Sequence, residues 1–309
     1  MPGGNSDKGL GADKNELYYS LIQSSQYIDW WHAPVPGENF DHEGNLASLI
    51  IKPGVIYGLS QKLNLFINTT LGTRIMNWHG ENESVHHRDE HTHENFSNAI
   101  GGIFGDSKLI LRYLIKNTGA GDGYRTILGG GITIPSKNTL TKSPFLKVDD
   151  EYAPHRHFSM SNGTYNLISD FQLYYKRSAN PVFFGGSITV EKPLSENEYY
   201  YLPPTSVRVL FSTIYKRFDK LDGSMDMSLG IESLSKAYWH DKPSPNSSAL
   251  VIIPSIGYLF NIKKGALSIS IQKPIFITGS FAGNEGDIAQ KTNIWQLILS
   301  FRSIPKILN

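Results

Sequence analysis

Histidine is the residue type with the clearest chemical use in this chain, because neutral imidazole nitrogens bind transition-metal ions. Ten histidines are present, and five of them fall within residues 79–93. His91 and His93 would share one face of an extended segment, whereas His87 and His91 would share one face of a helix. Either arrangement presents two imidazoles to a single ion.

Acidic residues in the same segment and a second histidine pair could complete a metal site. Carboxylates are interspersed with the five histidines, and His155 and His157 repeat the i, i+2 spacing in the next expected loop, where they could converge on the same ion. A shell of nitrogen and oxygen ligands suits Zn²⁺, Cu²⁺ or Ni²⁺ rather than Ca²⁺. We therefore predict a site for Zn²⁺ or Cu²⁺ whose ligands come from His79, His86, His87, His91, His93, His155, His157, Asp89 and Glu90.

Two other interpretations of these histidines stay open. They could be ordinary polar residues of solvated loops that bind metal weakly or not at all. They could also make the loops sensitive to pH, because histidine titrates near neutrality.

No other motif indicates catalysis. Cysteine is absent, so the chain has neither a disulfide nor a thiolate nucleophile, and the motifs GxSxG and HExxH are absent as well. Gly129, Gly130 and Gly131 fit strand bending, or space for a neighbouring side chain, better than a phosphate-binding loop. We expect no enzyme. A net charge of +1 without a basic cluster indicates no nucleic-acid partner.

Apolar and polar residues alternate over long segments, which indicates β-strands because successive side chains of a strand point to opposite faces. The clearest case runs from Thr164 to Lys176. A strand of about 9–11 residues is long enough to cross a bilayer. Twelve such segments are expected, at 16–30, 48–58, 62–77, 98–117, 124–134, 163–176, 181–191, 206–218, 223–237, 248–260, 265–277 and 292–303.

The connections between these segments alternate between long and short. Such a rhythm is typical of an up-and-down antiparallel barrel with an even number of strands and both termini on the periplasmic side. We therefore predict an all-β transmembrane barrel of about twelve strands in a bacterial outer membrane, at residues 15–309, after a flexible N-terminal tail at 1–14. Residues 1–15 show no apolar signal segment, and no run of eighteen apolar residues exists. The alternative is a soluble β-sandwich or barrel, whose apolar face would point inward.

This topology places particular residue types at the two ends of the barrel. All five tryptophans lie near the rim with long loops, and several tyrosines lie near the short turns, which predicts two aromatic girdles at the membrane interfaces. Pro254 and Pro274 fall inside predicted strands, where we expect bulges because proline donates no ladder hydrogen bond. Long loops are expected to hold all ten histidines, namely His32, His42, His79, His86, His87, His91, His93, His155, His157 and His240.

Charged residues on the polar faces of the strands must point into the barrel. A charge that faced lipid near mid-membrane would cost roughly 2–4 kcal/mol. An open polar lumen would favour transport, whereas a lumen blocked by paired charges would favour binding, and twelve strands leave room for either. The predicted lumen-lining residues are Arg74, Lys108, Arg112, Lys116, Asp170, Arg208, Lys216, Asp226 and Glu232.

One short segment resembles a known family. The run from Ile103 to Leu109, which contains Gly105 and Asp106, resembles the GxGD-type segment of outer-membrane transporters named for a meta-pathway of phenol degradation. The run from Gly131 to Ser136 is similar to the L-P-T-G of that family at the top of the following strand, with Ser136-Lys137 in place of Thr-Gly. The resemblance implies a barrel related to long-chain fatty-acid channels and passive transport of small molecules.

These features together predict an outer-membrane barrel that passively transports or captures a small solute. Its partners are then the lipid bilayer and a small molecule or metal ion, with the histidine-rich loops binding a transition metal. The alternative is a barrel without transport, whose loops engage a metal or a partner at the cell surface.

Overall fold

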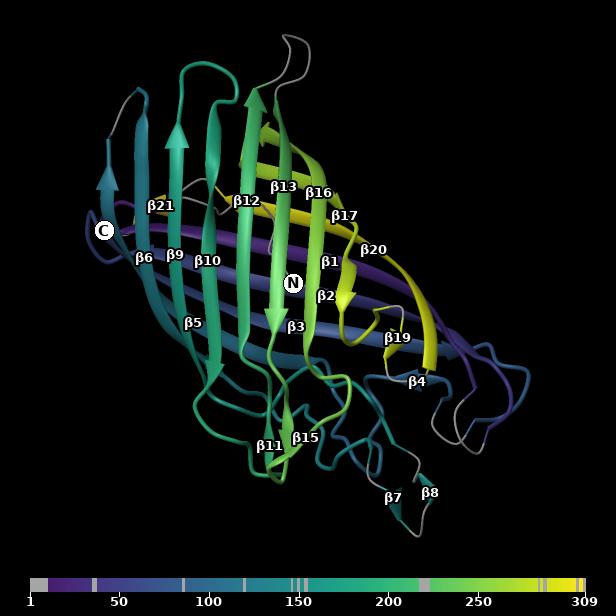
Figure 1. Cartoon of the computed structure of the whole chain (residues 1–309). Coiled ribbons are helices and arrows are strands. Elements are labelled where there is room, and N and C mark those ends of the chain that lie inside the picture. The colour runs from purple at the N-terminus through teal and green to yellow at the C-terminus, as the bar shows by residue number, and fades with distance from the viewer. Residues whose placement is uncertain are drawn as a thin grey trace.

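The computed structural model describes residues 11–34, 38–84, 87–118, 121–145, 147–148, 151–152, 155–216, 223–282, 284–285, 288–303 and 306–307. Within these ranges, twelve long antiparallel strands form one barrel, which the pairing of β1 with β20 closes (Figure 1). The strands are β1 (Glu16–His32), β2 (His42–Gly58), β3 (Leu63–Trp78), β5 (Phe104–Asn117), β6 (Gly123–Ile134), β9 (Asn166–Lys176), β10 (Phe183–Pro193), β12 (Ser206–Lys216), β13 (Gly223–Leu234), β16 (Ala249–Ile262), β17 (Gly265–Gln272) and β20 (Ile288–Ser303).

Short strands lie at the ends of the barrel. Most belong to the long connections, and several gather below the barrel in Figure 1. No helix among the described residues is long and apolar enough to cross a membrane. The short strands are β4 (Glu90–His91), β7 (Lys147–Val148), β8 (Glu151–Tyr152), β11 (Tyr201–Leu202), β14 (Tyr238–Trp239), β15 (Lys242–Pro243), β18 (Ile275–Thr278), β19 (Asn284–Glu285) and β21 (Lys306–Ile307).

The exterior of the barrel is apolar and the interior is largely polar. Along β9 burial alternates from residue to residue, with Asp170 and Gln172 buried while Phe171 and Leu173 are exposed. A soluble β-sandwich would bury the apolar face instead. The barrel therefore has the surface of a transmembrane barrel, and the prediction of a twelve-stranded antiparallel barrel is confirmed.

The predicted strand boundaries hold to within a few residues at most ends. Two starts differ by six residues, because β2 begins at His42 and β5 at Phe104, and the segment 265–277 divides into β17 and β18 at Pro274. β16 pairs with β17 from Ser255 onward and with β18 at 250–252, so Pro254 lies in the gap between the two ladders. The Lys273 N–H donates to the Pro254 carbonyl at 3.1 Å. The bulges expected at the two prolines are not found there: β16 continues through Pro254, which pairs with Leu229 of β13, and the register shift between β16 and β18 lies at Leu250 and Val251. At Pro274 the strand divides instead, which fits a residue without an N–H to donate.

The histidines and tryptophans depart from the prediction at the loop end. His32 ends β1, His42 begins β2, and the two are paired across the ladder, so the prediction that no histidine lies in a strand was wrong. The ladder of β1 and β2 continues as far as the pair of His32 and His42.

Trp30 and Trp78 pack against histidines, and Trp239 in β14 is 6% exposed, so these three tryptophans form no girdle toward lipid. Trp295 is exposed on the outer face, as expected.

Both described ends of the chain lie at the end of the barrel with short turns. Glu16 and Leu17 at the start of β1 pair with Ile307 and Lys306 of β21 (Figure 1). That this end faces the periplasm stays a prediction.

Part of the expected N-terminal tail is anchored inside the barrel. Ala12 is 3% exposed and packs with Ile56, Phe66 and Ile110. The Ala12 N–H donates to Asn64 Oδ1 at 2.9 Å, and Asn64 Nδ2 donates to the Ala12 carbonyl at 2.8 Å. Ala12 is therefore held inside the barrel, while residues 1–10 of the predicted flexible tail lie outside the described part of the chain.

Replacing Asn64 with leucine is expected to release this N-terminal segment. The substitution leaves the buried N–H and carbonyl of Ala12 without their partner, and each unsatisfied backbone group costs about 1–3 kcal/mol. Hydrogen exchange of residues 11–14 should speed up in Asn64→Leu and stay slow in Asn68→Leu, a matched change on the same strand. Equal exchange in the two variants would show that Asn64 does not hold the segment.

Candidate functional site

Among the described residues, three ion pairs occupy the polar interior of the barrel. Lys108 of β5 pairs with Glu191 of β10. Arg112 Nε lies 2.9 Å from Asp170 Oδ2, and Arg208 lies 2.6 Å from Glu232 Oε1. Since the partners come from different strands, the pairs tie the barrel wall together across its inner face.

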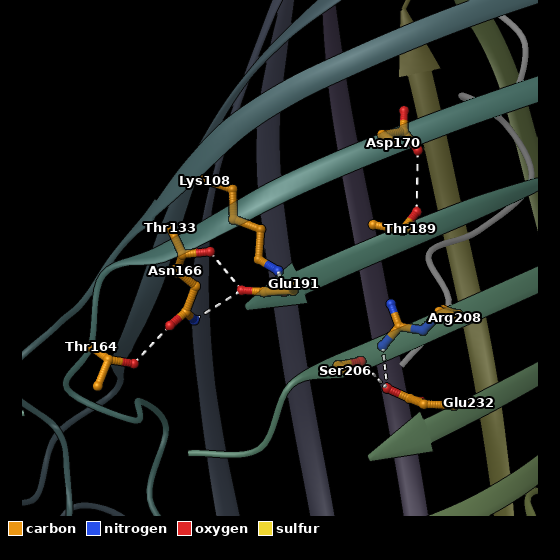
Figure 2. A network of polar contacts seen from close by, with 10 residues as sticks. All are labelled: Lys108, Thr133, Thr164, Asn166, Asp170, Thr189, Glu191, Ser206, Arg208 and Glu232. Atoms are coloured by element: carbon orange, nitrogen blue, oxygen red, sulfur yellow. Dashed lines mark hydrogen bonds and ion pairs between the residues drawn. The ribbon is translucent and has the colours of Figure 1, made fainter. Parts of the chain in front are cut away.

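Neutral hydroxyls and amides extend this network, as Figure 2 shows. Thr133 and Asn166 donate to Glu191 Oε1 at 2.6 and 3.1 Å. Thr189 donates to Asp170 Oδ1 at 3.1 Å, and Ser206 lies 3.3 Å from Glu232 Oε1. Buried carboxylates need such additional donors, because an ion pair alone rarely repays the loss of hydration.

The glycines of β6 make room for one of these pairs. A Cβ added at Gly129 would lie 3.2 Å from Arg112 Cγ and 3.2 Å from Asp170 Cβ, which is tight. This position confirms the expectation that the glycine run leaves space for a neighbouring side chain.

Most of the predicted lumen-lining residues face the interior. Asp226 is 2% exposed, and Arg74 donates to the Ser159 carbonyl of the loop above at 2.8 Å. Lys116 and Lys216 are instead exposed at the short-turn ends of their strands. Acidic residues neutralise the three cations of these ion pairs.

A buried arginine joins two of the long loops at the other end. Arg156 is fully buried, and its guanidinium donates to carbonyls of the loop between β3 and β5 at 2.8–3.3 Å, including those of Glu94 and Ile100. Its backbone is held by Asn98, which accepts from the Arg156 N–H at 2.7 Å and donates to the Arg156 carbonyl at 3.0 Å. Loop segments 90–101 and 155–161 therefore form one ordered unit, here called the loop cap.

Beside the loop cap, three imidazoles converge where β1 ends and β2 begins. His32 Nε2 lies 3.1 Å from His87 Nε2 and 3.2 Å from His42 Nδ1. Among the described residues, this is the one group of three histidines, cysteines or carboxylates whose ligand atoms all lie within 4.8 Å of one another. We call His32, His42 and His87 the histidine triad.

A neighbouring carbonyl fixes the tautomer of one triad histidine. His32 Nδ1 lies 2.8 Å from the Ala33 carbonyl, which can only accept, so the proton of His32 belongs on Nδ1 and its Nε2 carries a lone pair toward the other two rings. His42 Nε2 lies 2.8 Å from Glu38 Oε2, an ion pair when the imidazole is protonated. His32 Nε2 can therefore accept a proton shared with His42 Nδ1 or His87 Nε2, or bind a cation.

Aromatic side chains enclose the triad. The Trp78 ring stacks on His87 at 5.4 Å between centroids, and the Trp30 ring lies 4.6 Å from the same imidazole. His42 is completely buried, whereas His32 and His87 are partly exposed. Such packing holds the rings in place, and the partial exposure leaves access from solution.

Of the nine ligands predicted from the sequence, the structure places only His87 in the triad. His79 contacts Asn45, His93 contacts Thr73, and Asp89 accepts from the Trp78 N–H. The other predicted ligands lie elsewhere: His91 is exposed, Glu90 is buried in the loop cap, His155 and His157 lie next to the triad, and His86 is outside the described residues.

His32 and His42 were not among the predicted ligands, although a signal for them existed. They flank one connection, and extending the hairpin pairing of 16–30 by two residues places them opposite each other. Because histidines are densest in 79–93, the prediction from the sequence placed the metal site in that loop instead.

The carboxyl group of Glu90 is buried without a hydrogen-bond partner for either oxygen. Burial raises its pKa to about 7, against the weaker opposing effect of Arg88 and Arg156. Because the pKa lies above the ordinary value, the folded loop cap favours protonated Glu90. Ionisation of Glu90 therefore lowers the free energy of unfolding of the loop cap as pH rises from about 4.5 to about 7, by at most about 3 kcal/mol.

Glu90→Gln should remove this pH dependence. Protease resistance of segment 79–103 is expected to fall between pH 5 and pH 8 in the parent and to stay constant in the variant. Glu83→Gln, at an exposed position of the same loop, is the control and should behave like the parent. A parent whose loop is equally resistant at both pH values would contradict the assignment.

Comparisons with known proteins identify the fold. A crystal structure of an outer membrane channel from Pseudomonas putida F1 is similar over 98% of this chain and 99% of that chain, with a TM-score of 0.57 and 12% identity. The translocator domain of the autotransporter NalP from Neisseria meningitidis covers 97% of this chain and 92% of its own, with a TM-score of 0.43 and 8% identity. The toluene transporter TodX from P. putida covers 96% and 91%, with a TM-score of 0.42 and 10% identity.

In sequence, no protein-family model and no curated protein matches the chain. The resemblance to the phenol-degradation transporters therefore stays a resemblance. At 12% identity the likeness to the channel establishes the architecture alone. The chain has the fold of a bacterial outer-membrane β-barrel.

Proposed function

We propose that this protein is an outer-membrane barrel that captures a Zn²⁺ or Cu²⁺ ion at the histidine triad, at the loop end of its lumen. The observation that carries the proposal is the convergence of three imidazoles whose ligand atoms lie within 4.8 Å of one another, with His32 Nε2 at 3.1 Å from His87 Nε2 and 3.2 Å from His42 Nδ1. Two nitrogen ligands of one tetrahedral Zn²⁺, each at about 2.0–2.1 Å from the metal, lie about 3.3–3.4 Å apart. His32 Nε2 is thus separated from each of the other two nitrogens by nearly the distance between two ligands of one ion.

The surroundings of the triad also match those of metal-binding histidines. Such histidines usually donate their second N–H to a carboxylate or a backbone carbonyl, which fixes the ring and raises its basicity. The Ala33 carbonyl serves His32 in this way, and the Glu38 carboxylate lies 2.8 Å from Nε2 of His42. Three protein ligands leave a fourth position open to water or to a ligand from solution, which suits reversible capture.

Calorimetric titration of Zn²⁺ and Cu²⁺ into the detergent-purified protein tests the proposal. We expect stoichiometric binding to the parent at neutral pH that weakens as pH falls, because protons compete for imidazole nitrogens. The matched control is a triple variant with His32, His42 and His87 changed to asparagine. Equal heats from parent and control would overturn metal capture.

Passive passage of a small solute is the second candidate function. The polar interior along the ion-pair network favours it, as does the resemblance in fold to a protein described as an outer membrane channel. The pairing of three lumen cations with acidic residues favours capture instead. Conductance measurements on the protein reconstituted in a bilayer distinguish passage from capture. Stable open-channel current steps would support passage, and a bilayer without conductance would support capture alone.

A further inference from the structure

A second pair of imidazoles lies directly beside the triad. His155 Nε2 lies 3.2 Å from His157 Nε2, and the two rings meet edge to face with 4.7 Å between centroids. His155 is 4% exposed and therefore embedded in the loop cap, whereas His157 is partly exposed.

The residue between the two histidines explains why they face each other. Arg156 is fixed by its side chain, which donates to loop carbonyls, and by its backbone, which Asn98 holds on both sides. A residue anchored at so many points leaves little freedom to its neighbours. The histidine pair is therefore organised before any ligand arrives, which lowers the entropic cost of binding.

The pair and the triad form one continuous cluster of imidazoles. Ring centroids are separated by 4.5 Å from His42 to His32, 5.3 Å from His32 to His87, and 5.9 Å from His87 to His157. The His87 and His157 rings are inclined by only 30°. His157 thus bridges from the triad to the buried His155.

We infer that His155 and His157 form a second station for the same class of cation, which receives a Cu²⁺ or Zn²⁺ ion next to the one held by the triad. This inference rests on the proposed function. Two imidazoles supply two of the four ligands of such an ion, and water supplies the others. With one ligand fewer than the triad, the pair binds its ion more weakly. Stepwise transfer of an ion from the triad into the loop cap requires such a weaker site next to the triad.

Counting bound copper by native mass spectrometry and by calorimetry tests the inference. The parent should bind two Cu²⁺ ions, the second more weakly. His155→Gln/His157→Gln keeps hydrogen-bonding groups at both positions and should bind one ion with the parent's first affinity. His91→Gln/His93→Gln, in the neighbouring loop, is the control and should still bind two. Intact folding of each variant is checked by the shift in gel migration between unboiled and boiled samples.

The outcomes separate the second station from the triad. One ion in the parent, unaffected by the change at His155 and His157, overturns the second station and leaves the triad standing. No stoichiometric ion in the parent overturns both. Two ions in the parent with one in the pair variant support the inference, and magnetic coupling between the two Cu²⁺ centres in the parent, absent from the pair variant, would place them side by side.

Discussion

His32→Ala is expected to weaken the first Cu²⁺ or Zn²⁺ affinity by more than about 100-fold. Loss of a partner that merely orients a ligand typically costs 10–100-fold in metal affinity, and removing a ligand itself costs more. His32 contributes Nε2, the atom that lies within 3.2 Å of both other triad nitrogens. His42→Ala should behave similarly, and competition with a chelator of known affinity measures both.

The matched control for this prediction is His91→Ala/His93→Ala. These residues belong to the densest histidine segment, yet the structure leaves them outside the triad. Their removal should change the first affinity by no more than a few fold. The opposite pattern, with a large effect of His91 and His93 and none of His32, would place the metal in the loop that the sequence favoured.

Arg156→Met should loosen the loop cap while leaving the barrel intact. Methionine has a similar length but no donor, so the carbonyls that the guanidinium serves lose their partner in a buried place. Hydrogen bonds to a charged group contribute about 1.5–3 kcal/mol each, so the loss amounts to several kcal/mol of local stability. The cation–π contact with Phe96, at 5.2 Å, is lost as well.

Limited proteolysis measures this effect. Cleavage within 79–103 and 135–165 should be at least tenfold faster in Arg156→Met, whereas the heat-dependent gel shift of the barrel should persist. Arg177→Met, in a short turn at the opposite end of the barrel, is the control and should cleave like the parent. Unchanged cleavage in Arg156→Met would mean that other contacts hold the loops together.

The barrel could be predicted from the sequence because lipid imposes a simple rule on every strand. In β9 the outward positions hold residues such as Leu167 and Phe171, and the inward ones hold Asp170 and Gln172. Backbone groups must all be paired within the membrane, so an alternating strand has one compatible architecture, the closed barrel. The division of the predicted strand 265–277 at Pro274 also follows from the sequence, because proline has no N–H to donate to the ladder.

The metal-binding candidates could be predicted only by residue type. The triad joins the ends of β1 and β2 to a residue 45 positions further along, and only the pairing register brings them together. Nothing in the local sequence indicates that Arg156 is fully buried, since an arginine between two histidines is usually read as solvated. Tryptophan placement failed for the same reason: position along a strand does not reveal whether Trp30 packs against lipid or against His87.

Electron paramagnetic resonance of the protein with one equivalent of Cu²⁺ tests the central claim most directly. If the triad holds the ion, the spectrum should show hyperfine coupling to three imidazole nitrogens, and His32→Ala should change that pattern. A spectrum dominated by oxygen ligands, or one that His32→Ala leaves unchanged, would contradict metal capture by His32, His42 and His87.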